Sequence, residues 1–100
     1  DYIDWRDVSP EVGKGTISLD KKTIKNFKEH LTIYKNNKDE KNFYSVFALS
    51  SDGKVSGDMD GWGKKVSKTQ IEALAVAECM TNNKKEKCFI YAINDEVVWK

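Results

Sequence analysis

Two short turn signals, each set between apolar segments, constrain the fold of this chain more than any other feature. Asp52-Gly53 follows the apolar run Phe43–Ser50, and Asn94-Asp95 lies between two apolar segments near the C-terminus. Residue pairs of this kind adopt the tight turns that join antiparallel strands, so each predicts a β-hairpin. Phe43–Ser50 is apolar on both faces, which is typical of an interior strand. The four expected strands are Phe43–Ser50, Lys54–Asp58, Lys87–Ile93 and Glu96–Lys100.

The two-residue turn of the second hairpin also predicts its register. Ala92 is expected opposite Val97, and Ile90 opposite Trp99, because a register is set by the length of its turn. This pairing places Trp99 on a strand with a defined neighbour. It is therefore expected to be a core residue.

Apolar residues recur at helical spacing before the first hairpin. Ser18 and Asp20 both offer an N-cap for this segment, and the helix is expected to end near Asn36-Asn37, which tolerate a left-handed backbone. His30 lies beside the lysine-rich side of this helix and is expected at the surface. The apolar stripe consists of Ile24, Phe27, Leu31 and Tyr34.

A capping box predicts the second helix. Ser67 supplies the cap oxygen and Gln70 stands at the third helical position. The helix is expected to end near Asn82, and its small alanines favour close packing on a sheet. The expected buried face consists of Ile71, Leu74, Ala75 and Cys79.

The expected element order is α-β-β-α-β-β. Layer packing then favours an α+β fold, with a four-stranded antiparallel sheet of two hairpins and both helices packed on one face. One hundred residues predict a single domain over residues 1–100. Pro10, Gly13 and Gly15 interrupt residues 1–15, so this segment is expected to be an extended arm that Trp5 holds against the domain.

Cys79 and Cys88 are the two cysteines of the chain. The polar loop of residues 82–87 can bring them within disulfide range, and the bond would stabilise the fold by about 2.7 kcal/mol on chain-entropy grounds. Disulfides persist in oxidising compartments, so the pair predicts a secreted or periplasmic protein. The alternative is two reduced, buried thiols in a cytosolic protein.

Composition argues against several classes of function. A net charge of +1 does not suit a nucleic-acid binder. Apolar runs such as Ala73–Ala77 fall far short of the ~18 residues that a membrane span needs. One histidine and two cysteines give too few ligands for a zinc site, and no nucleophile motif is present. We therefore expect no cofactor, no metal, no catalytic residues and no enzymatic activity.

Residues 57–65 are expected to form a glycine-rich loop, in which Trp62 is the best candidate for an exposed aromatic. Packing of its ring in the core or against the loop is the alternative. An exposed tryptophan is a favoured anchor for a partner protein. Ser56–Gly61 is similar to the first half of a calcium-binding loop, but Ser67 stands where the bidentate glutamate belongs, so the carboxylates are interpreted as solvated. The predicted partner-binding residues are Trp62, Asp58, Met59 and Asp60.

Several short motifs resemble those of a small domain of unknown function in exported alphaproteobacterial proteins, sometimes appended to caspase-like peptidases. The resemblance spans roughly residues 13 to 99 and supports export and the Cys79–Cys88 bond. It carries no catalytic residues. The matching residues are Gly13-Lys14-Gly15-x-Ile17-x-Leu19, Phe27, Leu31, Phe47-Ala48-x-Ser50-x-Asp52-Gly53, Ala77-x-Cys79, Cys88-x-Ile90-Tyr91-Ala92 and Val97-Val98-Trp99.

These observations predict a small secreted or periplasmic, non-enzymatic domain that binds another protein through the loop of residues 57–65 and a hairpin edge. A bacterial effector that acts on a host protein fits the same description. Two alternatives stay open: a domain that binds cell-envelope polysaccharide, and a small protein inhibitor of an enzyme.

Overall fold

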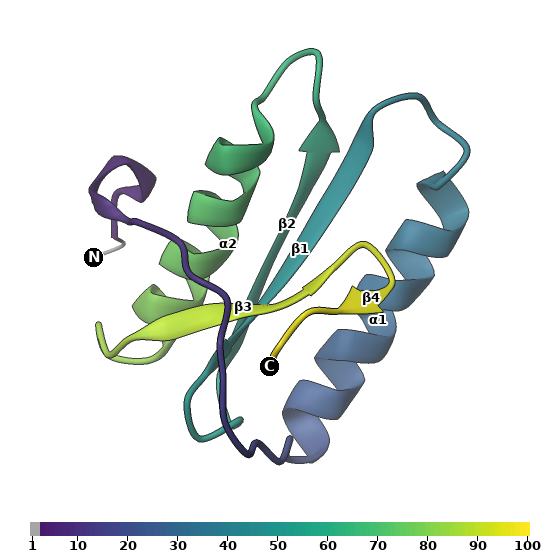
Figure 1. The fold of residues 1–100 in the computed structure, drawn as a ribbon. Helices are drawn as coiled ribbons and strands as arrows, with labels where there is room; N and C mark the ends of the chain where they lie inside the picture. The colour runs from purple at the N-terminus through teal and green to yellow at the C-terminus, as the bar shows by residue number, and fades with distance from the viewer. Residues whose placement is uncertain (1–2) are drawn as a thin grey trace.

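The computed structural model describes residues 3–100, in which two helices enclose a four-stranded antiparallel sheet (Figure 1). The α+β class and the order α-β-β-α-β-β are confirmed, with one short 3-10 turn added at the start. The elements are η1 (Trp5–Asp7), α1 (Lys21–Asn37), β1 (Phe43–Ser50), β2 (Ser56–Trp62), α2 (Lys68–Asn82), β3 (Cys88–Ile93) and β4 (Glu96–Val97).

The strands lie in the order β2-β1-β3-β4, so β1 is interior, as predicted. Every residue of β1 is buried. Both helix caps are also confirmed. The Asp20 side chain accepts a hydrogen bond from the Thr23 amide at 2.9 Å, and Ser67 Oγ accepts one from the Gln70 amide at 3.1 Å.

The helices cover opposite faces of the sheet, and the expectation that both pack on one face is wrong. Val46 and Ala48 of β1 belong to the core that includes α2 residues. Phe47 and Leu49 belong to a second core, against which Phe27 of α1 packs. Successive side chains of a strand point to opposite faces, so β1 contributes to both cores, and Figure 1 shows α1 and α2 on either side of it. Both faces of β1 are apolar because a helix covers each of them.

β2 is longer than predicted and absorbs most of the segment interpreted as a loop. It runs to Trp62 and pairs along its whole length with β1. A β-carbon on Gly57 would lie 2.3 Å from the backbone nitrogen of Cys79, and one on Gly61 would lie 3.3 Å from a side-chain carbon of Ile71. Glycine occurs in β2 because α2 packs closely on it, and not because the chain turns there.

β4 is shorter than predicted, and the expected pairing of Ile90 with Trp99 is wrong. The Ala92–Val97 pair is present, but both Val98 and Trp99 donate backbone hydrogen bonds to the Tyr91 carbonyl. Because two successive amides share one carbonyl, the residues after Val97 leave the register that the turn would otherwise set. Ile90 bridges instead to the N-terminal arm at Val12.

The buried face of α1 differs from the predicted stripe. Ile24 is 42% exposed, whereas Thr23 and His30 are buried, with His30 only 2% exposed. The expectation of a surface histidine is therefore wrong. The helix is rotated toward its polar residues because Thr23 Oγ1 donates to the Gly53 carbonyl at 2.7 Å and His30 Nε2 lies 2.7 Å from the Asn94 carbonyl oxygen.

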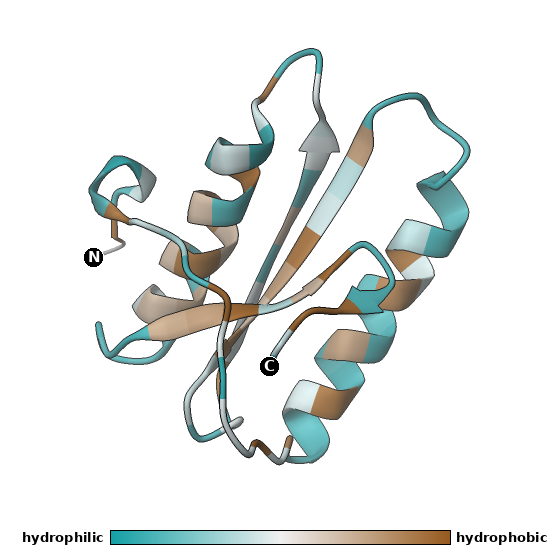
Figure 2. Ribbon diagram, viewed as in Figure 1, coloured by the Kyte–Doolittle hydropathy of each residue, from teal (hydrophilic) through white to brown (hydrophobic). Residues whose placement is uncertain are grey.

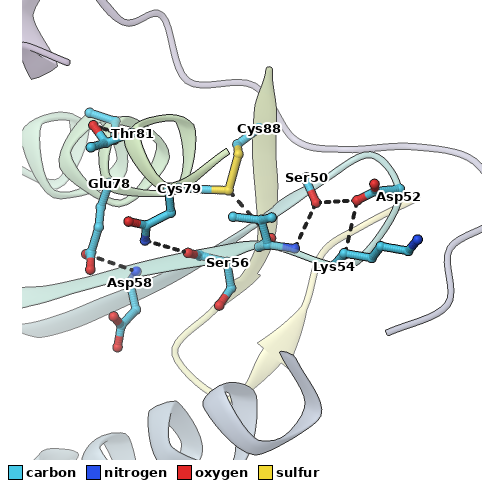
Figure 3. Close-up of a disulfide and its surroundings, with 12 residues drawn as sticks. Ser50, Asp52, Lys54, Ser56, Asp58, Glu78, Cys79, Thr81 and Cys88 are labelled. Atoms are coloured by element: carbon cyan, nitrogen blue, oxygen red, sulfur yellow. Dashed lines mark hydrogen bonds between the residues drawn. A yellow bond between two sulfur atoms is a disulfide. The ribbon is translucent and has the colours of Figure 1, made fainter. Parts of the chain in front are cut away.

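The predicted disulfide between Cys79 and Cys88 is present, with a Cα–Cα distance of 6.0 Å (Figure 3). It joins the end of α2 to the start of β3. Both cysteines belong to the apolar core on the α2 side of the sheet.

The hydropathy of the chain follows its fold. Figure 2 shows hydrophobic residues concentrated on β1, β3 and the inward sides of the helices, and a hydrophilic loop between α1 and β1.

Candidate functional site

All four predicted contact residues lie on β2, but they do not form one surface. Met59 packs against the core on the α2 side. Asp58 and Asp60 point to the α1 side, because residues one apart in a strand alternate between faces. Trp62 ends the strand and is 41% exposed.

Trp62 is exposed but held in place. Its indole Nε1 donates a hydrogen bond to Glu40 Oε2 at 3.0 Å, and its ring meets that of Phe43 edge-on with centroids 5.5 Å apart. The ring therefore presents a fixed apolar area to solvent, without the loss of side-chain entropy that an unconstrained tryptophan would suffer on binding.

The loops before β1 and after β2 lie at the same end of the sheet (Figure 1), and lysines from both loops lie beside Trp62. A hollow of about 390 Å³ lies beside the ring. We call its lining the Trp62 patch: Lys41, Asn42, Trp62, Lys64 and Lys65.

A second hollow, of about 540 Å³, adjoins the Trp62 patch and shares Lys41 and Lys64 with it. Its wall includes Tyr44, whose hydroxyl donates to Glu72 Oε2 at 2.6 Å and whose ring lies 5.2 Å from the Lys68 ammonium nitrogen. Burial and the neighbouring carboxylate raise the pKa of Tyr44, so its hydroxyl stays protonated. This end of the molecule combines cationic side chains with hydrogen-bond donors.

A polar cluster that the sequence did not indicate lies between α1 and the sheet. His30 Nε2 is hydrogen-bonded to the Asn94 carbonyl, while Asn94 Oδ1 accepts from the Ser45 amide at 3.0 Å. The Ser45 hydroxyl is buried and has no hydrogen-bond partner. Desolvation lowers the pKa of His30, against the opposing charges of Asp58 and Asp60.

The carboxylates on the α1 side of β2 repel one another. Burial raises the pKa of Asp58, and the charges of Asp60 and Glu29 raise it further. Glu78 of α2 also has a raised pKa, through burial and through Asp58. Its Oε2 accepts a hydrogen bond from the Asp58 amide at 3.3 Å (Figure 3). The edge of the sheet at β2 is therefore acidic.

Over residues 3–100, no group of three or more histidine, cysteine, aspartate or glutamate side chains is arranged to hold a metal ion. Among the same residues, no helix has the length and apolar character to cross a membrane.

No protein-family model, curated protein or solved structure matches this chain. The resemblance to the exported alphaproteobacterial domain therefore stays a prediction.

Proposed function

We propose that this chain is a non-enzymatic module that binds another protein through the Trp62 patch, in a secreted or periplasmic setting. The observation that carries the proposal is the state of Trp62. A large aromatic ring is fixed by Glu40 and Phe43 yet leaves 41% of its surface to solvent.

Tryptophan is the residue type most enriched among those that dominate binding energy at protein interfaces. A ring already fixed in the unbound protein loses little freedom on binding, which favours affinity. The apolar ring is also surrounded by polar groups, as interface anchors are.

The charges around Trp62 indicate what the partner presents. Lys41, Lys64 and Lys65 are exposed around one hollow. An acidic partner surface would be attracted to these ammonium groups, which raises the association rate and excludes basic competitors. The proposed partner therefore offers carboxylates around an apolar contact.

The disulfide supports the proposed compartment. The Cys79–Cys88 bond joins two elements of the core, and such bonds are rare where thioredoxin and glutathione keep thiols reduced. An exported protein is thus the setting in which this fold keeps its cross-link.

The test is capture of a partner by the intact protein, its Trp62→Ala variant and a matched Ile24→Ala variant. Ile24 is also an exposed apolar residue, at 42%, but it stands in the first turn of α1, whereas Lys41 and Asn42 of the Trp62 patch follow the last turn of that helix. We expect Trp62→Ala to weaken the partner's dissociation constant by about thirtyfold, as loss of a hot spot of about 2 kcal/mol would. Ile24→Ala should bind unchanged.

Equal affinity of all three proteins for the same partner would show that the Trp62 patch does not bind it. A tryptophan fluorescence change on titration with peptidoglycan or a glycan, in the absence of any protein partner, would favour the polysaccharide-binding alternative.

A further inference from the structure

β2 forms one edge of the sheet, and part of its outer backbone has no hydrogen-bond partner. The first half of this edge is satisfied by α2: Asn82 Nδ2 donates to the Ser56 carbonyl at 3.3 Å, and Glu78 accepts from the Asp58 amide. Beyond Asp58, the outward amides of Asp60 and Trp62 and the carbonyl of Asp60 bond to nothing within residues 3–100. An open strand edge is a template for another strand.

The opposite edge of the sheet does not offer the same opportunity. The N-terminal arm and the C-terminus cover it, with Ile90 bonded to Glu11 and Gly13, and Lys100 bonded to Gly13 and Gly15. Within residues 3–100, β4 at this edge has only two residues, so the longer open stretch of strand is the half of β2 that ends at the Trp62 patch.

An apolar hollow of about 240 Å³ begins at the same place, on the α2 side of the sheet. Met59, between the open positions of β2, lines it together with Leu74 of α2 and Trp5 of the arm. The arm is held there by a 2.9 Å hydrogen bond from the Ile3 amide to Thr81 Oγ1. A strand added along β2 would direct alternate side chains into this hollow.

On the α1 side of the open edge, the carboxylates of β2 favour a positively charged group on the added strand. Asp60 lies two residues from Asp58 on the same face of β2. An ammonium group beside Asp60 would relieve the repulsion between the two carboxylates.

We propose that β2 binds an extended segment of a partner protein as an added antiparallel strand, with a basic residue opposite Asp60, apolar residues facing the Met59 hollow and acidic residues reaching the Trp62 patch. This rests on the proposed function and specifies how the partner is bound. Backbone hydrogen bonds to Asp60 supply affinity, and the alternating side chains supply specificity. The antiparallel direction matches the pairing of the four strands of the sheet and is the stabler pairing.

The probe is the acetylated, amidated heptapeptide EEGVKVT, which in antiparallel register places its lysine opposite Asp60 and its valines on the Met59 side. Amide hydrogen exchange is measured in the intact protein with and without millimolar peptide. We expect exchange at the Asp60 amide to slow by about tenfold or more. The charge-swapped peptide KKGVEVT and an EEGVKVT peptide N-methylated at its lysine amide should give no protection.

Two variants test the same edge from the protein side. Asp60→Pro removes the outward amide, which no internal bond uses, and proline is tolerated at strand edges. Asp60→Asn keeps the amide and removes the charge. We expect Asp60→Pro to lose peptide binding, and Asp60→Asn to bind EEGVKVT more weakly than the intact protein does while still preferring it to KKGVEVT, whose two lysines face Lys64 and Lys65 of the Trp62 patch. The N-methylated peptide provides the same test in the unaltered protein, should Asp60→Pro fail to fold.

Strand addition is overturned if EEGVKVT leaves exchange at Asp60 unchanged, or if the N-methylated peptide binds equally well. Concentration-dependent protection of Asp60 without peptide, together with a dimeric mass, would assign the edge to a second copy of the chain and overturn the occupant proposed here. If Trp62→Ala loses the captured partner while Asp60→Pro keeps it, the binding module stands and strand addition falls.

Discussion

At the scale of single residues, His30 is the most consequential side chain of α1. It fills a position on the buried face, stacks on Phe27 with ring centroids 5.9 Å apart, and bonds to the Asn94 carbonyl in the turn between β3 and β4. Its Nε2 must carry a proton to donate to that carbonyl, which fixes the tautomer of the neutral ring. The helix, the sheet and the C-terminal hairpin therefore meet at one imidazole.

His30 also predicts how stability depends on pH. Because burial lowers its folded pKa below the ordinary value of 6.5, the unfolded chain takes up this proton first as the pH falls. The stability that His30 contributes is complete above about pH 6.5 and is lost as the pH falls through the folded pKa. The slope cannot exceed about 1.4 kcal/mol per pH unit for one proton.

Urea unfolding between about pH 7.5 and 5.5 checks this in the native chain and in a His30→Gln variant. We expect the native chain to lose more stability over this interval than His30→Gln, since the variant lacks the titrating ring. The raised pKa values of Asp58 and Glu78 act in the opposite direction in both proteins. Loss of the His30 charge, which lowers the Asp58 pKa, strengthens this opposite effect in His30→Gln and so widens the expected difference. Equal pH dependence in the two proteins would contradict the buried state of His30.

At the scale of elements, the contact between α2 and the sheet depends on small residues and on one cross-link. Gly57 and Ala75 let the helix approach β2 until a β-carbon at position 57 would lie 2.6 Å from the Ala75 carbonyl oxygen. The Cys79–Cys88 bond then joins the last turns of α2 to β3. This helix is placed by close backbone contact and a covalent bond, since its buried face offers few large side chains.

Reduction of the disulfide should destabilise the fold without changing it. The bond closes a short loop, for which chain entropy gives about 2.7 kcal/mol, an upper value because native strain subtracts from it. The urea midpoint of the native chain should fall when a thiol reductant is added. A Cys79→Ala/Cys88→Ala variant is the control, and its midpoint should be insensitive to reductant. A native midpoint that reductant leaves unchanged would show that the bond does not contribute to stability.

At the scale of the whole molecule, the two edges of the sheet differ in how far other segments cover them. The arm closes one edge by pairing with β3 and with the C-terminus, where Trp99 Nε1 also donates to the Gly15 carbonyl at 2.9 Å. The edge at β2 is covered by α2 only up to Asp58. Over residues 3–100, the longer open stretch of sheet edge is therefore the part of β2 that ends at the Trp62 patch.

Truncation of the arm tests the closed edge. Deletion of residues 1–13 removes the partners of Ile90 and uncovers the Trp99 ring, which lies against Gly13. With a net contribution of about 1 kcal/mol for each lost hydrogen bond, stability should fall by about 2–4 kcal/mol, with concentration-dependent association through the exposed strand. The shorter deletion of residues 1–7 leaves this pairing in place and should cost less. Equal stability of the two truncated proteins would show that the pairing of the arm with β3 does not contribute to stability.

The bounds of β1, the two helix caps and the disulfide could all be predicted from the sequence. Each depends on interactions between residues close in the chain: a turn after Ser50, an Asp20 or Ser67 oxygen next to exposed helix amides, and a short polar loop between two cysteines. Trp62 was the best candidate for an exposed aromatic, with packing of its ring as the alternative, and it is exposed at the end of β2.

The residues that the sequence misplaced are those whose environment comes from distant segments. Gly57 and Gly61 look like loop residues until α2 is placed above them. His30 looks like a surface residue until Asn94, far along the chain, supplies its hydrogen-bond acceptor. The open edge at Asp60 could not be predicted at all, because which strand is outermost depends on sheet order.

The chain's local patterns thus determined which segments become helices and strands, since hydrogen bonds within a turn or a cap need no distant partner. Only the tertiary structure decided that the helices enclose the sheet from both sides, that the arm completes one edge and that β2 leaves the other partly open. Those outcomes depend on which surfaces exclude water together and which backbone groups are left to pair, and both are properties of the folded chain as a whole.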